Sequence, residues 1–268
     1  CRRYDLYCNC IYNQCYDHQN ISFLFLWLCN GTWDGRYLDG HSGRSDIKIF
    51  IRVNSFQTGE MDENTYLKDE GETKSMPTLL FINACVRGKD SRTLALCERL
   101  LTSIKEANQK DMAFKIEEIR LSTENLIPLN YERLQRRDEL LANGIYEDSM
   151  FDYANAMAQA DMIVIAAPYW DMSFPASLKI FLEAASVVGI TFAYAEDGTP
   201  VGLCQAQDMY YVTTSGGYIG DCNFGFQYVN ALCKLYGIQH SHFISAQGLD
   251  MEGADIEALL EQAVIEEA

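Results

Sequence analysis

From residue 76 to the end of the chain, short apolar runs alternate with segments in which apolar positions recur every three or four residues. The runs at residues 78–85 and 162–167 are almost continuously apolar, as expected of strands buried on both faces. Residues 91–108 carry the stripe of a helix with one buried side. The same reading predicts strands at residues 114–121, 209–214 and 241–246, and helices at residues 131–143, 148–160, 175–188, 223–236 and 255–267.

This order predicts a parallel α/β sheet. Strands that alternate with helices are joined by right-handed crossovers and lie parallel. The segment at residues 114–121 alternates between apolar and polar positions, which indicates an edge strand. With five strands and no second βαβαβ half, the flavodoxin-like strand order 2-1-3-4-5 is favoured over the six-stranded Rossmann order. The fold class is therefore a flavodoxin-like three-layer sandwich with a five-stranded parallel sheet.

In residues 1–75 the apolar positions recur neither with the helical period of 3.6 residues nor with the strand period of 2. Glu70-Gly71-Glu72 can be encoded by a purine-rich ribosome-binding sequence a few codons before Met76. We therefore expect residues 1–75 to be translated upstream DNA, with the native start at Met76 and one domain over residues 76–268. The alternative is a genuine N-terminal extension that is disordered. The apolar run at residues 21–27 is too short to span a bilayer and does not resemble a secretory signal.

Composition narrows the function classes. The formal net charge of −17 argues against nucleic acid and anionic membranes as partners. Of the ten cysteines, those beyond residue 75 are scattered singly, as are buried thiols of a reducing compartment. This favours a cytoplasmic protein. No C-x-x-C motif supports zinc or an iron–sulfur cluster.

Three connections follow predicted strands and therefore meet at the carboxyl edge of the sheet, where open α/β sheets bind ligands. The first, residues 84–93, ends with two hydroxyl residues at a helix start, a good phosphate site, with Arg87 or Arg92 supplying charge. The second, residues 168–174, is aromatic and nearly uncharged, and the third, residues 214–218, contains two glycines that allow close approach of a ligand.

Each connection alone has a plainer interpretation. Asp90 or Ser91 can simply cap a helix, an aromatic loop can cover a surface, and Gly216-Gly217 can form a tight turn. Together they predict a site for a mononucleotide with a flat ring. No G-x-G-x-x-G motif predicts a separately bound dinucleotide. His240 and His242, on or beside the last strand, are interpreted as structural.

The chain resembles a known family, the flavodoxin-like FMN-dependent NAD(P)H oxidoreductases that include the azoreductases and NADH:quinone oxidoreductases. The resemblance lies in A-A-P-Y-W-D-M-S-F-P-A-S-L-K from residue 166 and V-G-I-T-F-A-Y-A-E-D-G-T-P-V-G-L from residue 188. It covers the chain after Met76. The positions that it implies for FMN binding are Cys85, Ser91, Arg92, Thr93, Pro168, Tyr169, Trp170, Asp171, Met172, Thr214, Ser215, Gly216 and Gly217.

Several of these positions differ from the family pattern. Cys85 stands where the family has a serine, which weakens a phosphate contact that Arg92, in place of glutamine, offsets. Ser215 replaces an arginine and removes a charge near the ring. Asp171 replaces an asparagine and brings an anion that disfavours the anionic reduced flavin.

The resemblance implies an enzyme that passes a hydride from NADH or NADPH through FMN to a small-molecule electron acceptor such as a quinone, an azo dye or a nitroaromatic compound. No catalytic side chain and no metal are predicted. Members of the family are usually homodimers, and residues 188–202 are the candidate dimer or pocket-lid segment. Two alternatives are an FMN-binding flavodoxin-type electron carrier that docks protein partners, and a binding module that has lost flavin.

Overall fold

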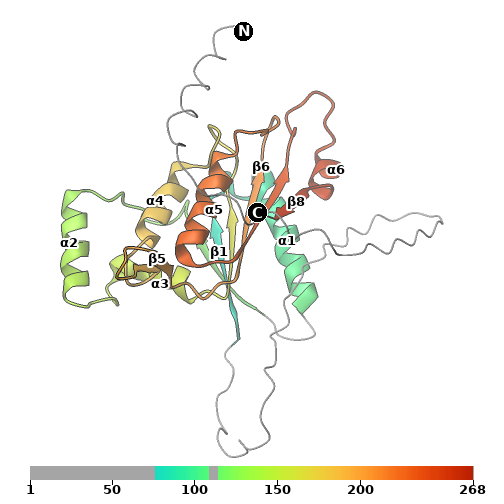
Figure 1. Ribbon diagram of the computed structural model, residues 1–268. Helices are drawn as coiled ribbons and strands as arrows, with labels where there is room; N and C mark the ends of the chain where they lie inside the picture. Colours follow the sequence, from blue (N-terminus) through green and yellow to red (C-terminus); the bar gives the residue numbers. More distant parts are fainter. Residues whose placement is uncertain (1–75, 109–113, 268) are drawn as a thin grey trace, which may run out of the picture. The chain divides into compact units, whose positions relative to one another are not determined.

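The computed structural model describes residues 76–108 and 114–267, so the interpretation of residues 1–75 lies outside the described part of the chain. Figure 1 shows a sheet covered by helices on both faces. Its strands are β1 (Thr78–Asn83), β2 (Lys115–Arg120), β3 (Met162–Ala166), β6 (Asp208–Thr214), β7 (His240–Ala246) and β8 (Val264–Glu267). A separate hairpin pairs β4 (Phe192–Tyr194) with β5 (Pro200–Gly202).

The helices are α1 (Arg92–Asn108), α2 (Tyr131–Ala142), α3 (Asp152–Gln159), α4 (Ala176–Ala185), α5 (Phe224–Tyr236) and α6 (Ile256–Glu261). Two short 3-10 turns, η1 (Gly88–Asp90) and η2 (Ser149–Phe151), precede α1 and α3. None of the helices in the described part of the chain combines the length and the apolarity that a membrane crossing requires.

The strand order confirms the predicted topology. The sheet runs β2-β1-β3-β6-β7-β8, and the first five of these strands are parallel. They are the five predicted strands in the order 2-1-3-4-5. β2 is an edge strand, as its alternating pattern predicts.

The prediction of one long helix over residues 255–267 is wrong. Helix α6 ends at Glu261, and Val264–Glu267 pairs antiparallel with β7 as a sixth strand. The β-branched pair Val264-Ile265 favours a strand over a helix, and pairing covers the edge of β7 that would otherwise expose unpaired backbone groups. The predicted end of the helix over residues 175–188 is also late, because α4 stops at Ala185.

A buried threonine explains why α4 stops there. Thr191 is fully buried, and its hydroxyl donates to the Ala185 carbonyl at 3.0 Å and accepts from the Val187 N–H at 3.1 Å. One side chain thus satisfies the carbonyl of the last helical residue and the N–H of the second residue beyond it. The chain is turned toward the β4–β5 hairpin as a result.

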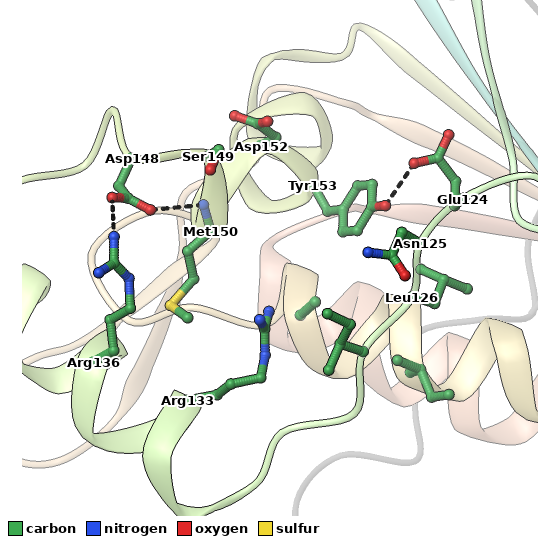
Figure 2. A pocket seen from close by; sticks show the side chains of 13 residues that line it. Glu124, Asn125, Leu126, Arg133, Arg136, Asp148, Ser149, Met150, Asp152 and Tyr153 are labelled. Atoms are coloured by element: carbon green, nitrogen blue, oxygen red, sulfur yellow. Dashed lines mark hydrogen bonds and ion pairs between the residues drawn. The ribbon is translucent and has the colours of Figure 1, made fainter.

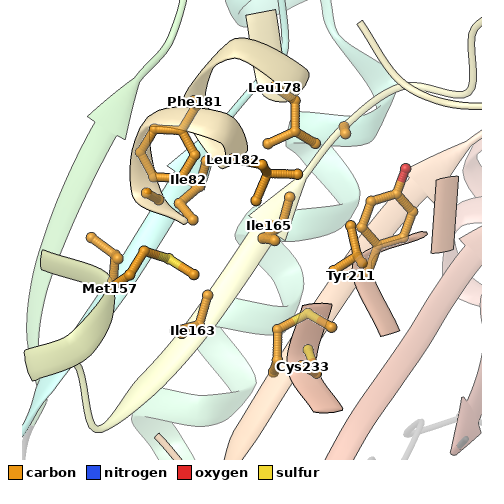
Figure 3. Packing of buried hydrophobic residues seen from close by; sticks show 14 of the residues in the cluster. Ile82, Met157, Ile163, Ile165, Leu178, Phe181, Leu182, Tyr211 and Cys233 are labelled. Carbon is orange, nitrogen blue, oxygen red and sulfur yellow. The ribbon is translucent and has the colours of Figure 1, made fainter. Parts of the chain in front are cut away.

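Alternate residues of the central strands face two separate cores, because successive side chains of a strand point to opposite sides of the sheet. Leu80, Ile82, Ile163 and Ile165 pack against α3, α4 and α5, and Figure 3 shows Phe181 and Leu182 of α4 over this face. On the other face, α1 and α6 cover a second cluster that includes Leu79, Phe81, Val164, Val212 and Ile244.

The β4–β5 hairpin lies at the amino edge of the sheet. Cys204 donates its N–H to the carbonyl of Tyr236, the last residue of α5, and Gln205 donates to Ala158 near the end of α3. Three residues later the chain enters β6 at Asp208. Within one chain, residues 188–202 therefore lie away from the carboxyl edge and do not form a lid over its loops.

Candidate functional site

The three predicted connections meet at the carboxyl edge of the sheet, and we call the surface that they form the rim. The rim consists of residues 84–93 after β1, 168–174 after β3 and 214–218 after β6. The Thr93 and Thr214 hydroxyls lie 2.6 Å apart, and both side chains are buried. Tyr169 donates its N–H to the Thr214 carbonyl at 3.1 Å. Thr214 therefore holds the phosphate-type loop and the aromatic loop against the glycine loop.

Helix α1 begins at the rim with unpaired backbone donors. Ser91 precedes the helix, and its hydroxyl accepts from the Leu94 N–H at 3.3 Å while its carbonyl accepts from the Ala95 N–H at 3.0 Å. Ser91 therefore does cap the helix. In the described part of the chain, the N–H groups of Arg92 and Thr93 make no backbone or side-chain hydrogen bond. Two donors at the positive end of the helix dipole thus remain available to an anion.

Cys85 lies under this loop rather than on its surface. Its side chain is buried, its N–H donates to Asn83 Oδ1 at 2.9 Å, and its thiol contacts the Ala166 carbonyl at 3.7 Å. Burial raises the pKa of Cys85 to about 11. The thiol therefore stays protonated at neutral pH and is a weak donor, consistent with a weakened phosphate contact.

The aromatic loop contains a tight turn with two residues in the left-handed region. Trp170 and Ser173 exchange two backbone hydrogen bonds of 3.1 and 2.8 Å, and between them Asp171 has φ 49° and Met172 has φ 66°. Residues other than glycine rarely adopt this backbone conformation, so the turn is strained. Such strain is typical of functional sites. The turn lifts Trp170, Asp171 and Met172 into solvent.

Tyr169 anchors this loop to the molecule. Its ring is partly buried, and its hydroxyl donates to the Cys222 carbonyl at 3.0 Å. Burial raises the pKa of the Tyr169 hydroxyl, so it remains a donor. Pro168 is partly buried at the start of the loop. Trp170, which is 44% exposed, and Met172, which is 53% exposed, are the free apolar surfaces here.

A fourth connection, residues 247–251 after β7, completes the rim and was not predicted. Gly248, Leu249 and Asp250 donate their N–H groups to the carbonyls of Gly217, Ser215 and Gly216, at 3.1, 3.1 and 2.9 Å. The Ser215 hydroxyl donates to the Gly217 carbonyl at 2.6 Å. The glycine loop is therefore fixed from both sides. Residues 247–251 follow a predicted parallel strand, so the same-edge rule that found the other loops was the available signal.

Arg92 is committed to this fourth connection. Its guanidinium donates to the Leu249 carbonyl at 3.1 Å and to Asp250 Oδ1 at 2.7 Å. The two glycines of the glycine loop differ in the space around them. A Cβ on Gly216 would lie 2.2 Å from Asp250 Oδ2, whereas one on Gly217 would meet nothing within 4 Å. Gly216 thus leaves room for Asp250, and Gly217 leaves open space at the rim.

His240 and His242 lie away from the rim, as predicted. His240 begins β7 and so lies at the amino edge. His242 Nε2 lies 2.8 Å from Asp208 Oδ1, and its ring stacks on Tyr210 with centroids 4.4 Å apart. Among residues 76–108 and 114–267, no group of three or more His, Cys, Asp or Glu side chains is placed to hold a metal ion.

Comparisons with known proteins agree with this geometry. The family model described as "Flavodoxin-like fold" matches residues 77–266. The FMN-dependent NADH:quinone oxidoreductase of Coprothermobacter proteolyticus is 31% identical over 197 residues, which cover 71% of this chain and 96% of that protein. A Clostridium perfringens protein of the same name is 31% identical over 196 residues, covering 70% of this chain and 95% of that protein.

Solved structures share the fold. An FMN-dependent NADH-azoreductase from Bacillus anthracis in complex with FMN has a TM-score of 0.59 at 23% identity, covering 69% of this chain and 94% of that one. The NAD(P)H:quinone oxidoreductase from Methanothermobacter marburgensis has a TM-score of 0.51 at 16% identity, covering 70% of this chain and 95% of that one. The chain belongs to the flavodoxin-like family of FMN-dependent NADH:quinone oxidoreductases.

Proposed function

We propose that this chain is an FMN-dependent oxidoreductase that passes a hydride from NADH or NADPH to a quinone, azo or nitroaromatic acceptor. The observation that carries the proposal is the junction at Thr214, where a helix N-terminus, an aromatic turn and a glycine loop meet at one edge of a parallel sheet. This is the place where open α/β sheets bind nucleotides. The relatives named above support the flavin and the nicotinamide co-substrate.

The residues present fit the phosphate of FMN. The free N–H groups of Arg92 and Thr93 lie at the start of a long helix, and Arg92 adds a guanidinium that Asp250 and Leu249 hold in place. Ser91 caps the helix, and its hydroxyl, which also lies beside the Cys85 thiol, can rotate to donate to an acceptor. We infer that Ser91, Arg92 and the N–H of Thr93 hold the phosphate. The buried side chains of Cys85 and Thr93 support the loop beneath it.

The residues also fit a flat ring. Trp170 and Met172 expose apolar surface on one side of the rim, and Gly217 leaves open backbone on the other. FMN, when bound, supplies the hydride-accepting and hydride-donating chemistry. The chain contributes position: the anchored Tyr169 fixes the aromatic turn, and the bonds from residues 248–250 fix the glycine loop.

Two substitutions relative to the family pattern concern the charge around the ring. Ser215 is buried and engaged with Gly217, so it places no cation near the ring. Asp171 is exposed at the tip of the strained turn. Both changes make the surroundings more negative, which favours an uncharged acceptor over an anionic one.

We further propose a cytoplasmic homodimer. Residues 188–202 lie at the amino edge and leave Val188, Tyr194 and Val201 exposed, which suits a contact with a second copy better than a lid over the rim of the same chain. Residues 1–75 remain proposed as upstream translation or an extension.

Steady-state kinetics test the function. The purified full chain, loaded with FMN, is expected to oxidise NADH or NADPH only when a quinone such as menadione is present. A chain that binds FMN but does not turn over either nicotinamide would contradict the enzyme and leave the electron carrier. A colourless chain that does not take up FMN would leave the binding module.

A further inference from the structure

A second concave site lies away from the rim. A pocket of about 300 Å³ opens between the connection after β2, helix α2, the start of α3 and helix α4. None of the rim residues lines it. Its volume is at the lower end of the range for small-molecule sites. The pocket is lined by Glu124, Asn125, Leu126, Ile127, Arg133, Arg136, Asp148, Ser149, Met150, Asp152, Tyr153, Ile180 and Ala184.

Most charged groups in its wall already have partners. Arg136 donates to Asp148 Oδ2 at 2.8 Å, and Asp148 also accepts from the Met150 N–H at 3.0 Å. That backbone bond, with Arg136 beside it, lowers the pKa of Asp148. Glu124 accepts from the Tyr153 hydroxyl at 2.7 Å. These pairs are drawn as dashed lines in Figure 2.

Arg133 is the exception. Its Nε is buried and has no hydrogen-bond partner in the described part of the chain, and its guanidinium makes no ion pair there. In Figure 2 the guanidinium of Arg133 and the carboxamide of Asn125 both point into the space below the Tyr153 ring, whereas Asp152 points away from Arg133. A buried guanidinium N–H without a partner is costly unless an acceptor reaches it.

Apolar side chains also contribute to the wall, beside the polar ones. The apolar lining residues include Leu126, Ile127, Met150 and Ile180, and in Figure 2 the Tyr153 ring lies above the space that Arg133 enters. Tyr153 is itself held against Phe181, with ring centroids 5.1 Å apart. The pocket therefore offers one cationic fork and one amide beside a group of apolar side chains.

We propose that this pocket binds a small monocarboxylate with a flat apolar body, of the benzoate type. The carboxylate pairs with the fork of Arg133, and the carboxamide of Asn125 donates to it. The ring lies among Met150, Ile180 and Tyr153. This site is separate from the proposed flavin site and does not depend on it.

A carboxylate fits better than a phosphate. Arg133 is the one lining cation without a carboxylate partner, whereas Glu124, Asp148 and Asp152 contribute three acidic groups to the wall. A dianion would meet repulsion that a single cation does not offset, and it would not contact the apolar side chains of the wall. A monocarboxylate uses the bidentate geometry that guanidinium groups favour.

Isothermal titration of benzoate into the full chain tests the proposal, with benzamide as the uncharged analogue. Arg133→Met is expected to weaken benzoate binding by about tenfold or more, because a charge-assisted pair is lost. The matched control is Arg137→Met, since Arg137 lies on the same helix, also has a buried unpaired Nε and does not line the pocket. It should bind benzoate as the unchanged chain does.

Arg133→Lys serves as a second variant, and it should retain part of the affinity because the charge remains without the fork. The proposal would be overturned by any of four results: no benzoate binding at millimolar concentration, equal binding of benzamide, unchanged affinity in Arg133→Met, or displacement of benzoate by equimolar inorganic phosphate. Far-ultraviolet circular dichroism verifies that each variant is folded.

Discussion

Glycines have different roles at the two edges of the sheet. At the carboxyl edge, a Cβ on Gly217 would meet nothing within 4 Å, and Trp170 and Tyr218 stand in solvent. At the amino edge, a Cβ on Gly202 would lie 2.1 Å from the backbone nitrogen of Gly237. A glycine at one edge leaves space open, and a glycine at the other lets two backbones touch. The first edge suits a ligand, and the second holds the hairpin to the fold.

Gly202→Ala gives the largest expected effect on this comparison. The added methyl group would meet the backbone of Tyr236 and Gly237, which cannot move without disturbing the end of α5. We expect urea unfolding to report a loss of about 3 kcal/mol or more. Gly217→Ala is the matched control and should change the free energy of unfolding by less than about 0.5 kcal/mol. Equal losses in both variants would show that the edges do not differ in this way.

Thr93→Val tests the junction of the rim. It leaves the Thr214 hydroxyl buried without its 2.6 Å partner, and an unsatisfied buried hydroxyl costs about 1–3 kcal/mol. The double variant Thr93→Val/Thr214→Val should lose less than the sum of the single losses, because both polar groups are then removed. Strict additivity in urea unfolding would contradict a direct bond between the two hydroxyls.

Two thiols, that of buried Cys85 and that of partly buried Cys204, predict a decline of stability in alkaline solution. Burial raises the pKa of Cys85 at the rim from 9.0 to about 11, and that of Cys204 near the hairpin from 9.0 to about 12. Above pH 9 the unfolded chain releases these protons before the folded chain does. Each thiol therefore reduces stability as pH rises, by on the order of 1 kcal/mol per pH unit.

The decline due to Cys85 should end near pH 11, whereas that due to Cys204 should continue toward pH 12. Urea unfolding of Cys85→Ala and Cys204→Ala between pH 8 and about 11 checks the decline itself, because the stability of each variant should fall less steeply than that of the unchanged chain. Identical slopes in all three chains would mean that neither thiol is buried as described.

Asp250→Asn gives the smallest expected change in stability. The Arg92–Asp250 pair is largely exposed, and such pairs contribute about 0–1 kcal/mol. Its effect should instead be on FMN affinity, since Arg92 loses the group that positions it. Gly216→Ala should act in the same direction by displacing the Asp250 carboxylate. Fluorescence titration of FMN measures both, and a variant with unchanged affinity would place Arg92 outside the phosphate site.

Local pattern was sufficient for the five parallel strands, their order in the sheet and three loops of the rim. Continuous apolar runs identified β1 and β3, and the alternation of β2 placed it at an edge. Local pattern could not predict contacts between distant segments. Asp250 is separated from Arg92 by 158 positions in the chain, and nothing near either residue indicates their pairing.

The C-terminal strand and the Arg133 pocket were missed for related reasons. Acidic residues around Val264 and Ile265 fit a helix surface as well as an edge strand, and only the free edge of β7 decides between them. The pocket forms because α2, a surface helix without buried residues, is placed near α3 and α4. Its position depends on the whole fold, and a helical period alone does not give it.

A crystal structure of the full chain soaked with FMN tests the central claim most directly. We expect the phosphate within hydrogen-bond distance of the Arg92 and Thr93 N–H groups at the start of α1, with the ring between the turn at Trp170 and the glycine loop. An empty rim, or FMN bound at another place on the chain, would contradict it.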